Sequence, residues 1–151
     1  MHTPFLRWLY RWGPALGLMA AIFALSSLPA AAVYRVSSPV VGTLNETAPA
    51  AARLQVNWLK VGHVLGYAGL GLAYLRGFGL RRGQARAAGL AALACTLFAG
   101  TDELHQAFVP GRSAGAEDVA LDAAAALAAI LIFLMIMWLY NTNKKTASRR
   151  I

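Results

Sequence analysis

The chain has 151 residues, of which 58% are hydrophobic and only 13% are charged, and its formal net charge is +8. Soluble domains average roughly 45–50% apolar and about 25% charged residues, so this composition indicates a membrane protein. The basic excess does not indicate nucleic-acid binding, because no basic stripe with interleaved aromatic residues accompanies it. The single cysteine, Cys95, excludes a disulfide within the chain.

The N-terminal residues predict a membrane span that starts at an interface. Arg7 and Arg11 lie among aromatic residues, a combination typical of a membrane surface. An apolar run follows, and we interpret 12–28 as the first span. Ala30-Ala31-Ala32 also resembles a signal-peptidase site, so a cleaved signal peptide is the alternative.

Residues 29–57 contain three of the six prolines, with polar residues between them. Proline lacks the N–H that a helix interior requires, so this composition predicts an extended outer loop. A short surface helix near residues 50–56 is compatible with it.

Three further apolar segments predict spans over 58–75, 87–106 and 118–140. The connections between them are a basic turn at 76–86 and a turn at Pro110-Gly111. A basic tail, 141–151, closes the chain. Gly62 and Gly66 have the small-xxx-small spacing that allows close helix packing. The expected fold is all-α, a four-helix transmembrane bundle formed by one domain, 1–151.

The basic residues predict the orientation of that bundle. The N-terminus, the 76–86 turn and the tail together hold ten of the fourteen Lys and Arg residues and no acidic residue. Positive charge marks the cytoplasmic side of a membrane, so both termini are expected inside. The predicted location is the bacterial inner membrane, crossed by several passes.

This orientation brings the polar residues of the apolar segments to one level at the extracytoplasmic face. Ionisable residues within spans are costly, and the default interpretation is a functional site. Helical spacing puts Asp102, His105 and Gln106 on one face, at i, i+3 and i+4. Similar spacings group residues of the second and fourth spans: Lys60, His63 and Tyr67, and Asp118 with Asp122.

Three motifs combine in this chain: Lys60-x-x-His63-x-x-x-Tyr67, Asp102-Glu103-x-His105-Gln106-x-Phe108-x-Pro110-Gly111-Arg112, and Asp118-x-x-x-Asp122, with Ser26-Ser27-x-Pro29 before them. This combination resembles the VanZ-like family of small bacterial membrane proteins. The resemblance covers about residues 20–135 and implies an envelope location and an association with teicoplanin resistance. This chain departs from the family's pattern at Leu59, where an acidic residue is common, and in the Ala123–Ala126 run, where glycines are common.

The polar residues suggest three kinds of site. Asp102, Glu103 and His105 are candidate acid–base residues. Arg112 and Lys60 could hold a phosphate, because a guanidinium fork matches phosphate oxygens. The remaining candidate ligand-binding residues are His63, Gln106, Asp118 and Asp122.

Other roles for the same residues stay open. The carboxylates and histidines could bind a divalent metal, although no zinc-type spacing is present. They could also only pair with Lys60 and Arg112 and hold helices together. Ser26 or Ser27 could serve as a nucleophile, although serines at helix ends more often bond across helices. The sequence does not identify a cofactor.

Three functions follow from these possibilities. The first is binding or altering a lipid-linked or cell-envelope intermediate, which would change glycopeptide (teicoplanin) sensitivity. The second is a phosphatase or transferase acting on a lipid-linked phosphate in the outer leaflet. The third is a structural or assembly protein. The expected partners are membrane lipids and a lipid-linked phosphate or cell-wall precursor. A transporter is less favoured, because the cytoplasmic halves of the spans offer no polar path.

Overall fold

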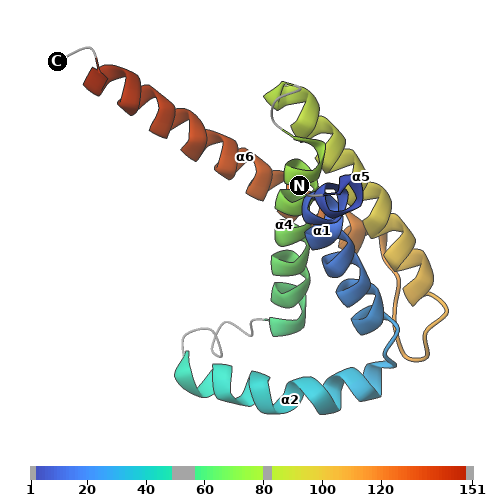
Figure 1. The fold of residues 1–151 in the computed structure, drawn as a ribbon. Coiled ribbons are helices and arrows are strands. Elements are labelled where there is room, and N and C mark those ends of the chain that lie inside the picture. The colour runs from blue at the N-terminus through green and yellow to red at the C-terminus, as the bar shows by residue number, and fades with distance from the viewer. Residues whose placement is uncertain (1–2, 49–56, 80–82, 149–151) are drawn as a thin grey trace.

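The computed structural model describes residues 3–48, 57–79 and 83–148, and these are almost entirely helical (Figure 1). The five helices are α1 (Pro4–Ser26), α2 (Ala30–Thr47), α4 (Trp58–Phe78), α5 (Gln84–Gln106) and α6 (Ala116–Ser148). No strand occurs in the described residues, so the all-α prediction is confirmed.

Helix α4 lies at the centre and packs against α1, α5 and α6. Its buried side chains include Tyr67 and Leu70, which share a core with Cys95 of α5 and Ala126 of α6. Arg11 near the start of α1 donates hydrogen bonds to backbone carbonyls at the end of α4, so these two helices run antiparallel. Helix α2 lies apart from this packing and crosses below the ends of α1 and α4 (Figure 1).

Three of the described helices are long and apolar enough to cross a membrane: Pro4–Ser26, Gln84–Gln106 and Ala116–Lys144. The expected second span, 58–75, forms α4 but does not reach the same hydropathy. Lys60 and His63 lie in its first turns, and glycines and tyrosines follow. A helix covered by three others needs less apolar surface than one that faces lipid. A four-helix transmembrane bundle with both termini inside stays a prediction.

Side-chain caps fix where α1 and α4 begin. The Thr3 hydroxyl accepts a hydrogen bond from the Leu6 N–H at 3.4 Å, and Pro4 occupies the first turn of α1. The Asn57 side chain accepts from the Lys60 N–H at 3.1 Å. Such caps satisfy N–H groups that have no partner within the helix. The Asn57 cap marks the start of α4, so Lys60 and His63 lie in the first two turns of this helix.

The extended loop expected over 29–57 is wrong for most of its length, because α2 occupies Ala30–Thr47. Pro29 is the N-cap residue, where no helical N–H is required. Pro39 lies inside the helix, where its missing N–H costs one backbone hydrogen bond. The short helix considered near 50–56 lies outside the described residues. The segment expected to form a tail continues α6 as far as Ser148.

Among the glycines of the described residues, Gly71 comes closest to the backbone of another helix: a Cβ atom there would lie 2.9 Å from the Ala126 carbonyl oxygen. The Gly62/Gly66 spacing predicted a close approach elsewhere. A Cβ on Gly62 would meet nothing within 4 Å, and one on Gly66 would make ordinary contact with Ile22. Close helix contact in α4 therefore occurs at Gly71, which faces the alanine run of α6, and at Gly77, where a Cβ would meet the Trp12 ring of α1.

Candidate functional site

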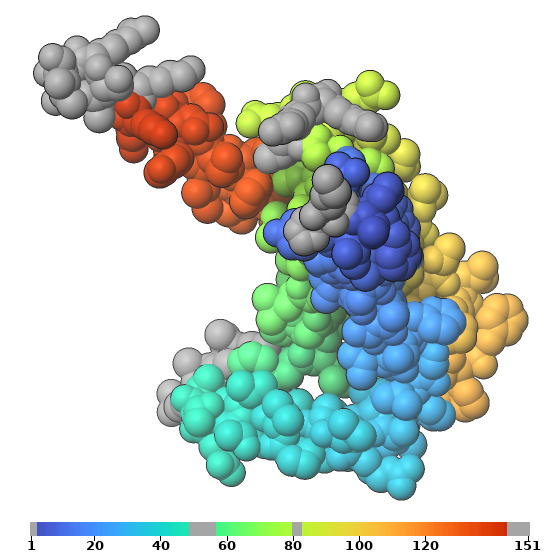
Figure 2. All heavy atoms as spheres, in the orientation of Figure 1, coloured from blue at the N-terminus to red at the C-terminus, as the bar shows by residue number. Residues whose placement is uncertain are grey.

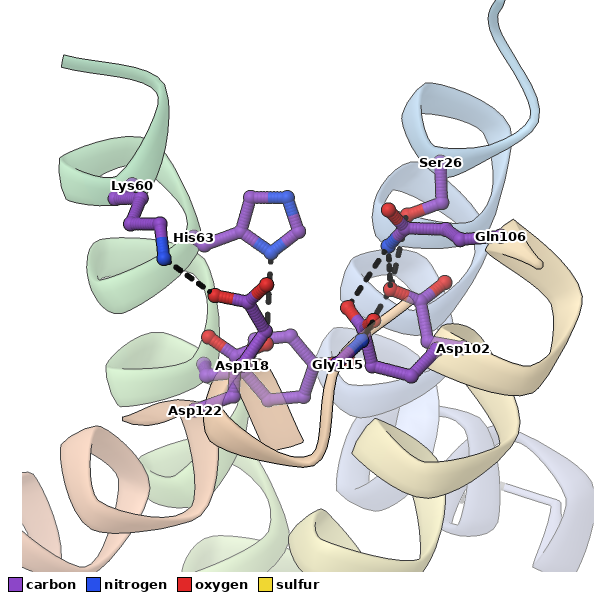
Figure 3. A network of polar contacts seen from close by, with 10 residues as sticks. Ser26, Lys60, His63, Asp102, Gln106, Gly115, Asp118 and Asp122 are labelled. Atoms are coloured by element: carbon purple, nitrogen blue, oxygen red, sulfur yellow. Dashed lines mark hydrogen bonds and ion pairs between the residues drawn. The ribbon is translucent and has the colours of Figure 1, made fainter. Parts of the chain in front are cut away.

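The polar residues of the motifs meet where four helix ends come together. Helices α1 and α5 end there, with Ser26 and Gln106 in their last turns, and α4 and α6 begin there. Figure 3 shows two groups of side chains at this level. One surrounds Asp102, and the other joins the first turns of α4 and α6.

Asp102 is the acceptor that joins three helices. Its Oδ2 atom accepts hydrogen bonds from Ser26 Oγ at 2.9 Å, Gln106 Nε2 at 3.1 Å and the Tyr67 hydroxyl at 3.5 Å. The side chain is only 2% exposed, and Oδ1 has no partner among the described residues. A buried carboxylate needs such donors, because it has lost its contact with water.

Glu103 ties the end of α5 to the start of α6. Its Oε2 atom accepts from the Gly115 backbone N–H at 3.1 Å, and Oε1 accepts from Gln106 Nε2 at 3.3 Å. Both donors are uncharged, and the Glu103 side chain is buried. The residue therefore brings a carboxylate to the site without a cation bonded to it among the described residues.

The second group consists of two pairs between α4 and α6. Lys60 Nζ lies 2.7 Å from Asp118 Oδ1, in a salt bridge that is open to solvent. His63 Nδ1 lies 3.4 Å from Asp122 Oδ2, and Asp122 is 1% exposed. The spacing of Asp118 and Asp122, four residues apart, puts both on the face of α6 that meets Lys60 and His63. The Oδ1 atom of Asp122 has no partner in the described chain.

Arg112 contacts the end of α1. Its Nε atom donates to the Leu28 carbonyl and its Nη2 atom to the Leu25 carbonyl, each at 3.3 Å. The Leu25 carbonyl also accepts the Leu28 N–H at 3.2 Å, so the guanidinium adds to the capping of this C-terminus. The two bonds occupy two of its five N–H donors.

His105 lies on the other side of the α1 terminus. Its ring stacks on Phe23 with 4.4 Å between centroids, and Nε2 lies 3.1 Å from Ser27 Oγ. The Ser27 hydroxyl donates to the Phe23 carbonyl at 2.7 Å, so its hydrogen is already used within α1. This arrangement separates His105 from Asp102 and Glu103, with which it was grouped as an acid–base candidate.

Two adjoining cavities open at this level. The first, which we call the apolar groove, has a volume of about 260 Å³ and lies between α1, α2 and α4, where Figure 2 shows a hollow. Its walls include Leu25, Val33, Val36 and Trp58. Trp58 is held by a hydrogen bond from its Nε1 atom to Asn45 Oδ1 of α2, at 2.8 Å.

The second cavity, which we call the polar pocket, has a volume of about 250 Å³. Its charged lining residues are Lys60, Glu103, Arg112, Asp118 and Asp122. Carboxylates therefore exceed permanent cations by one. Leu59, His63 and Arg112 line both cavities, which makes the groove and the pocket contiguous.

Within the described chain, no three His, Cys, Asp or Glu side chains are arranged to hold a metal ion. The carboxylates of the site instead accept hydrogen bonds from Ser, Tyr, Gln and a backbone N–H, or pair with Lys60 and His63. This geometry favours ion pairing or ligand binding over metal coordination.

Most of the predicted site residues meet in this layer. Lys60, His63, Glu103, Gln106, Arg112, Asp118 and Asp122 line the polar pocket, whereas Asp102 lies behind it and His105 lines neither cavity. Sequence reasoning did not include Ser26 and Tyr67 as partners of Asp102. The i+7 spacing of Tyr67 from Lys60, which puts both on one face of the helix, was the signal that could have identified Tyr67 as a site residue. It also missed the groove, because part of its wall, Val33, Val36 and Ser37, comes from α2.

A family model described as VanZ/LLP1 matches residues 12–138. The chain belongs to the VanZ-like family. No curated protein and no solved structure is detectably similar to it. The matched region holds α2, both cavities and every residue of the two polar groups. Together with the three apolar helices, the family assignment identifies this VanZ-like chain as a membrane protein.

Proposed function

We propose that this VanZ-like protein binds an amphiphilic cell-envelope molecule, such as a lipid-linked intermediate, at the extracytoplasmic face. By holding or altering that molecule it changes sensitivity to glycopeptides such as teicoplanin. The observation that carries the proposal is that the apolar groove adjoins the polar pocket at Leu59, His63 and Arg112, which line both. A contiguous apolar and polar site matches a molecule that has a hydrocarbon chain and a polar head.

The groove suits the chain of such a molecule. Its walls are mostly aliphatic and aromatic side chains from three helices. The polar residues among them include Ser26, Ser37, His63 and Arg112, of which His63 and Arg112 also line the polar pocket. Together the two cavities reach the volume of roughly 300–1,000 Å³ that small-molecule sites usually have.

The distribution of basic residues supports an extracytoplasmic position for the site. The cavities lie at the end of α4 opposite to Arg76, and the basic segments belong to the other end of the packed helices. The positive-inside rule places that basic end in the cytoplasm. An outer-leaflet molecule then reaches the groove by moving within the leaflet.

A phosphatase or transferase acting on a lipid-linked phosphate is the second candidate. Lys60 and Arg112 line the same pocket as Glu103, which is the combination that phosphate binding with acid–base chemistry requires. Purified protein that releases phosphate from a lipid phosphate, and loses this turnover in Glu103→Gln, would favour that candidate over binding alone.

The binding proposal is tested by a pair of valine substitutions on α2. Val36 lines the groove, whereas Val40 is one turn further along α2 and lines neither cavity; both side chains are exposed. We expect Val36→Glu to reduce the amount of phospholipid that remains bound in native mass spectra of the detergent-purified protein. A carboxylate in the groove would oppose a hydrocarbon chain, because its desolvation is costly.

Val40→Glu makes the same chemical change outside the groove and should retain lipid as the parent chain does. If the parent chain and both variants retain the same amount of phospholipid, the groove is not the lipid-binding site. A protein that retains no lipid before any substitution would remove amphiphile binding altogether. The purely structural function would then be favoured.

A further inference from the structure

We propose that the amphiphile of this site is a phospholipid with a zwitterionic head, whose phosphate lies at Arg112 and whose terminal ammonium lies against Glu103 and Asp122. The inference rests on the proposed binding function and specifies its ligand. Its basis is the order in which cationic and anionic side chains follow one another from the groove into the pocket.

Arg112 stands at the junction of the two cavities. It lines both, so the first polar group beyond a hydrocarbon chain in the groove meets its guanidinium. Its bonds to the Leu25 and Leu28 carbonyls use only two of the five N–H donors that a guanidinium carries. Those bonds also hold the side chain in place, which lowers the entropy cost of binding an anion. Lys60, in the same pocket, adds a second positive charge.

The carboxylates lie beyond this junction. Glu103, Asp118 and Asp122 line the polar pocket and not the groove. Asp118 is paired with Lys60 at 2.7 Å. Glu103 accepts only from uncharged donors among the described residues, and it is 6% exposed. Its negative charge is therefore not balanced by a bonded cation in the described chain.

Asp122 is the second carboxylate that favours a cationic ligand. It is 1% exposed, and its Oδ1 atom has no hydrogen-bond partner in the described residues. Its only titratable neighbour within bonding distance in that part of the chain is His63, at 3.4 Å. Buried carboxylates with open acceptor sites are costly unless a donor or cation reaches them. An ammonium group supplies three N–H donors and one positive charge.

This order of charges matches one class of membrane lipid. In a phospholipid such as phosphatidylethanolamine the phosphate is next to the acyl chains and the ammonium ends the head. The same order runs from the groove into the pocket: apolar wall, guanidinium, then three carboxylates, of which only Asp118 is paired with Lys60. A head with a phosphate and no ammonium would add negative charge to a pocket in which carboxylates already predominate.

The test compares three lipids with identical acyl chains in native mass spectrometry of the detergent-purified full chain. The lipids are phosphatidylethanolamine, its N-acetylated derivative and phosphatidylglycerol. We expect phosphatidylethanolamine to bind about tenfold more tightly than the other two, which is the usual effect of one charged hydrogen-bonded group. Equal binding of all three would overturn the zwitterion proposal and leave amphiphile binding intact. Binding of none would overturn both.

Two carboxamide variants identify the carboxylate that gives the selectivity. Glu103→Gln keeps the shape of the side chain and should abolish the roughly tenfold preference for phosphatidylethanolamine. Glu117→Gln removes the same charge from an exposed side chain that lines neither cavity, and should keep the preference. A preference that survives Glu103→Gln would overturn the assignment of the ammonium to Glu103. Arg112→Lys should weaken the binding of all three lipids by a similar factor, because all three carry the phosphate.

Discussion

At the scale of single residues, Asp102 is the acceptor on which the helix ends depend. Three donors from α1, α4 and α5 converge on one of its oxygens, Oδ2. Asn at this position offers one oxygen and an NH₂ group in place of the second oxygen. The Oδ1 position has no partner among the described residues, so the new amide hydrogens would be buried without an acceptor.

We therefore expect Asp102→Asn to lower the free energy of unfolding by about 1–3 kcal/mol. The measurement is the unfolding midpoint of the detergent-purified protein. Asp118→Asn is the matched control, because Asp118 pairs with Lys60 in a solvent-open salt bridge, and such bridges contribute little. If the two variants lose the same stability, Asp102 does not join the helix ends in the way described.

At the scale of helices, the contact between α4 and α6 depends on Gly71. The alanine run of α6 fits against α4 because Gly71 has no side chain where Ala126 approaches. A Cβ on Gly71 would lie 3.1 Å from both Cα and Cβ of Ala126, and closer to its carbonyl oxygen. These are mostly backbone atoms, so relief requires the helices to move apart.

Gly71→Ala is expected to destabilise the protein by about 1–3 kcal/mol, the usual cost of overpacking a close contact. Gly89→Ala on α5 provides the comparison, because nothing lies within 4 Å of its added Cβ. Alanine favours helix over glycine, so that variant should be as stable as the parent or slightly more stable. Thermal unfolding in detergent measures both. A tolerated Gly71→Ala would mean that α4 and α6 are not in close backbone contact.

At the scale of the whole molecule, hydropathy and charge predicted the helices that pack together. The expected segments 58–75, 87–106 and 118–140 correspond to α4, α5 and α6, since long apolar runs can satisfy their backbone groups in a membrane only as helices. The motif residues were predicted to gather at one level because helix direction alternates along the chain. That argument needs no knowledge of the side-chain partners.

Other features could not be predicted, because they depend on contacts between distant residues. Helix α2 was missed, since Pro29 and Pro39 resemble loop residues unless their places at the N-cap and within a helix are known. The cap that Arg112 forms on α1 joins residues 84 and 87 positions apart. His105 was grouped with Asp102 by helical spacing, yet the end of α1 lies against its ring. The apolar groove needs α2 and so could not be inferred.

The proposed function requires the cavities to open on the extracytoplasmic side, and one labelling experiment tests this most directly. Ser113 lines the polar pocket and Lys144 lies near the other end of α6, both exposed, while the native Cys95 is 0% exposed. We expect a membrane-impermeant maleimide to label Ser113→Cys in intact spheroplasts, and Lys144→Cys only after permeabilisation. The unmodified chain should remain unlabelled in both conditions. The opposite pattern, with Lys144→Cys labelled in intact spheroplasts and Ser113→Cys protected, would place the site in the cytoplasm and contradict an outer-leaflet function.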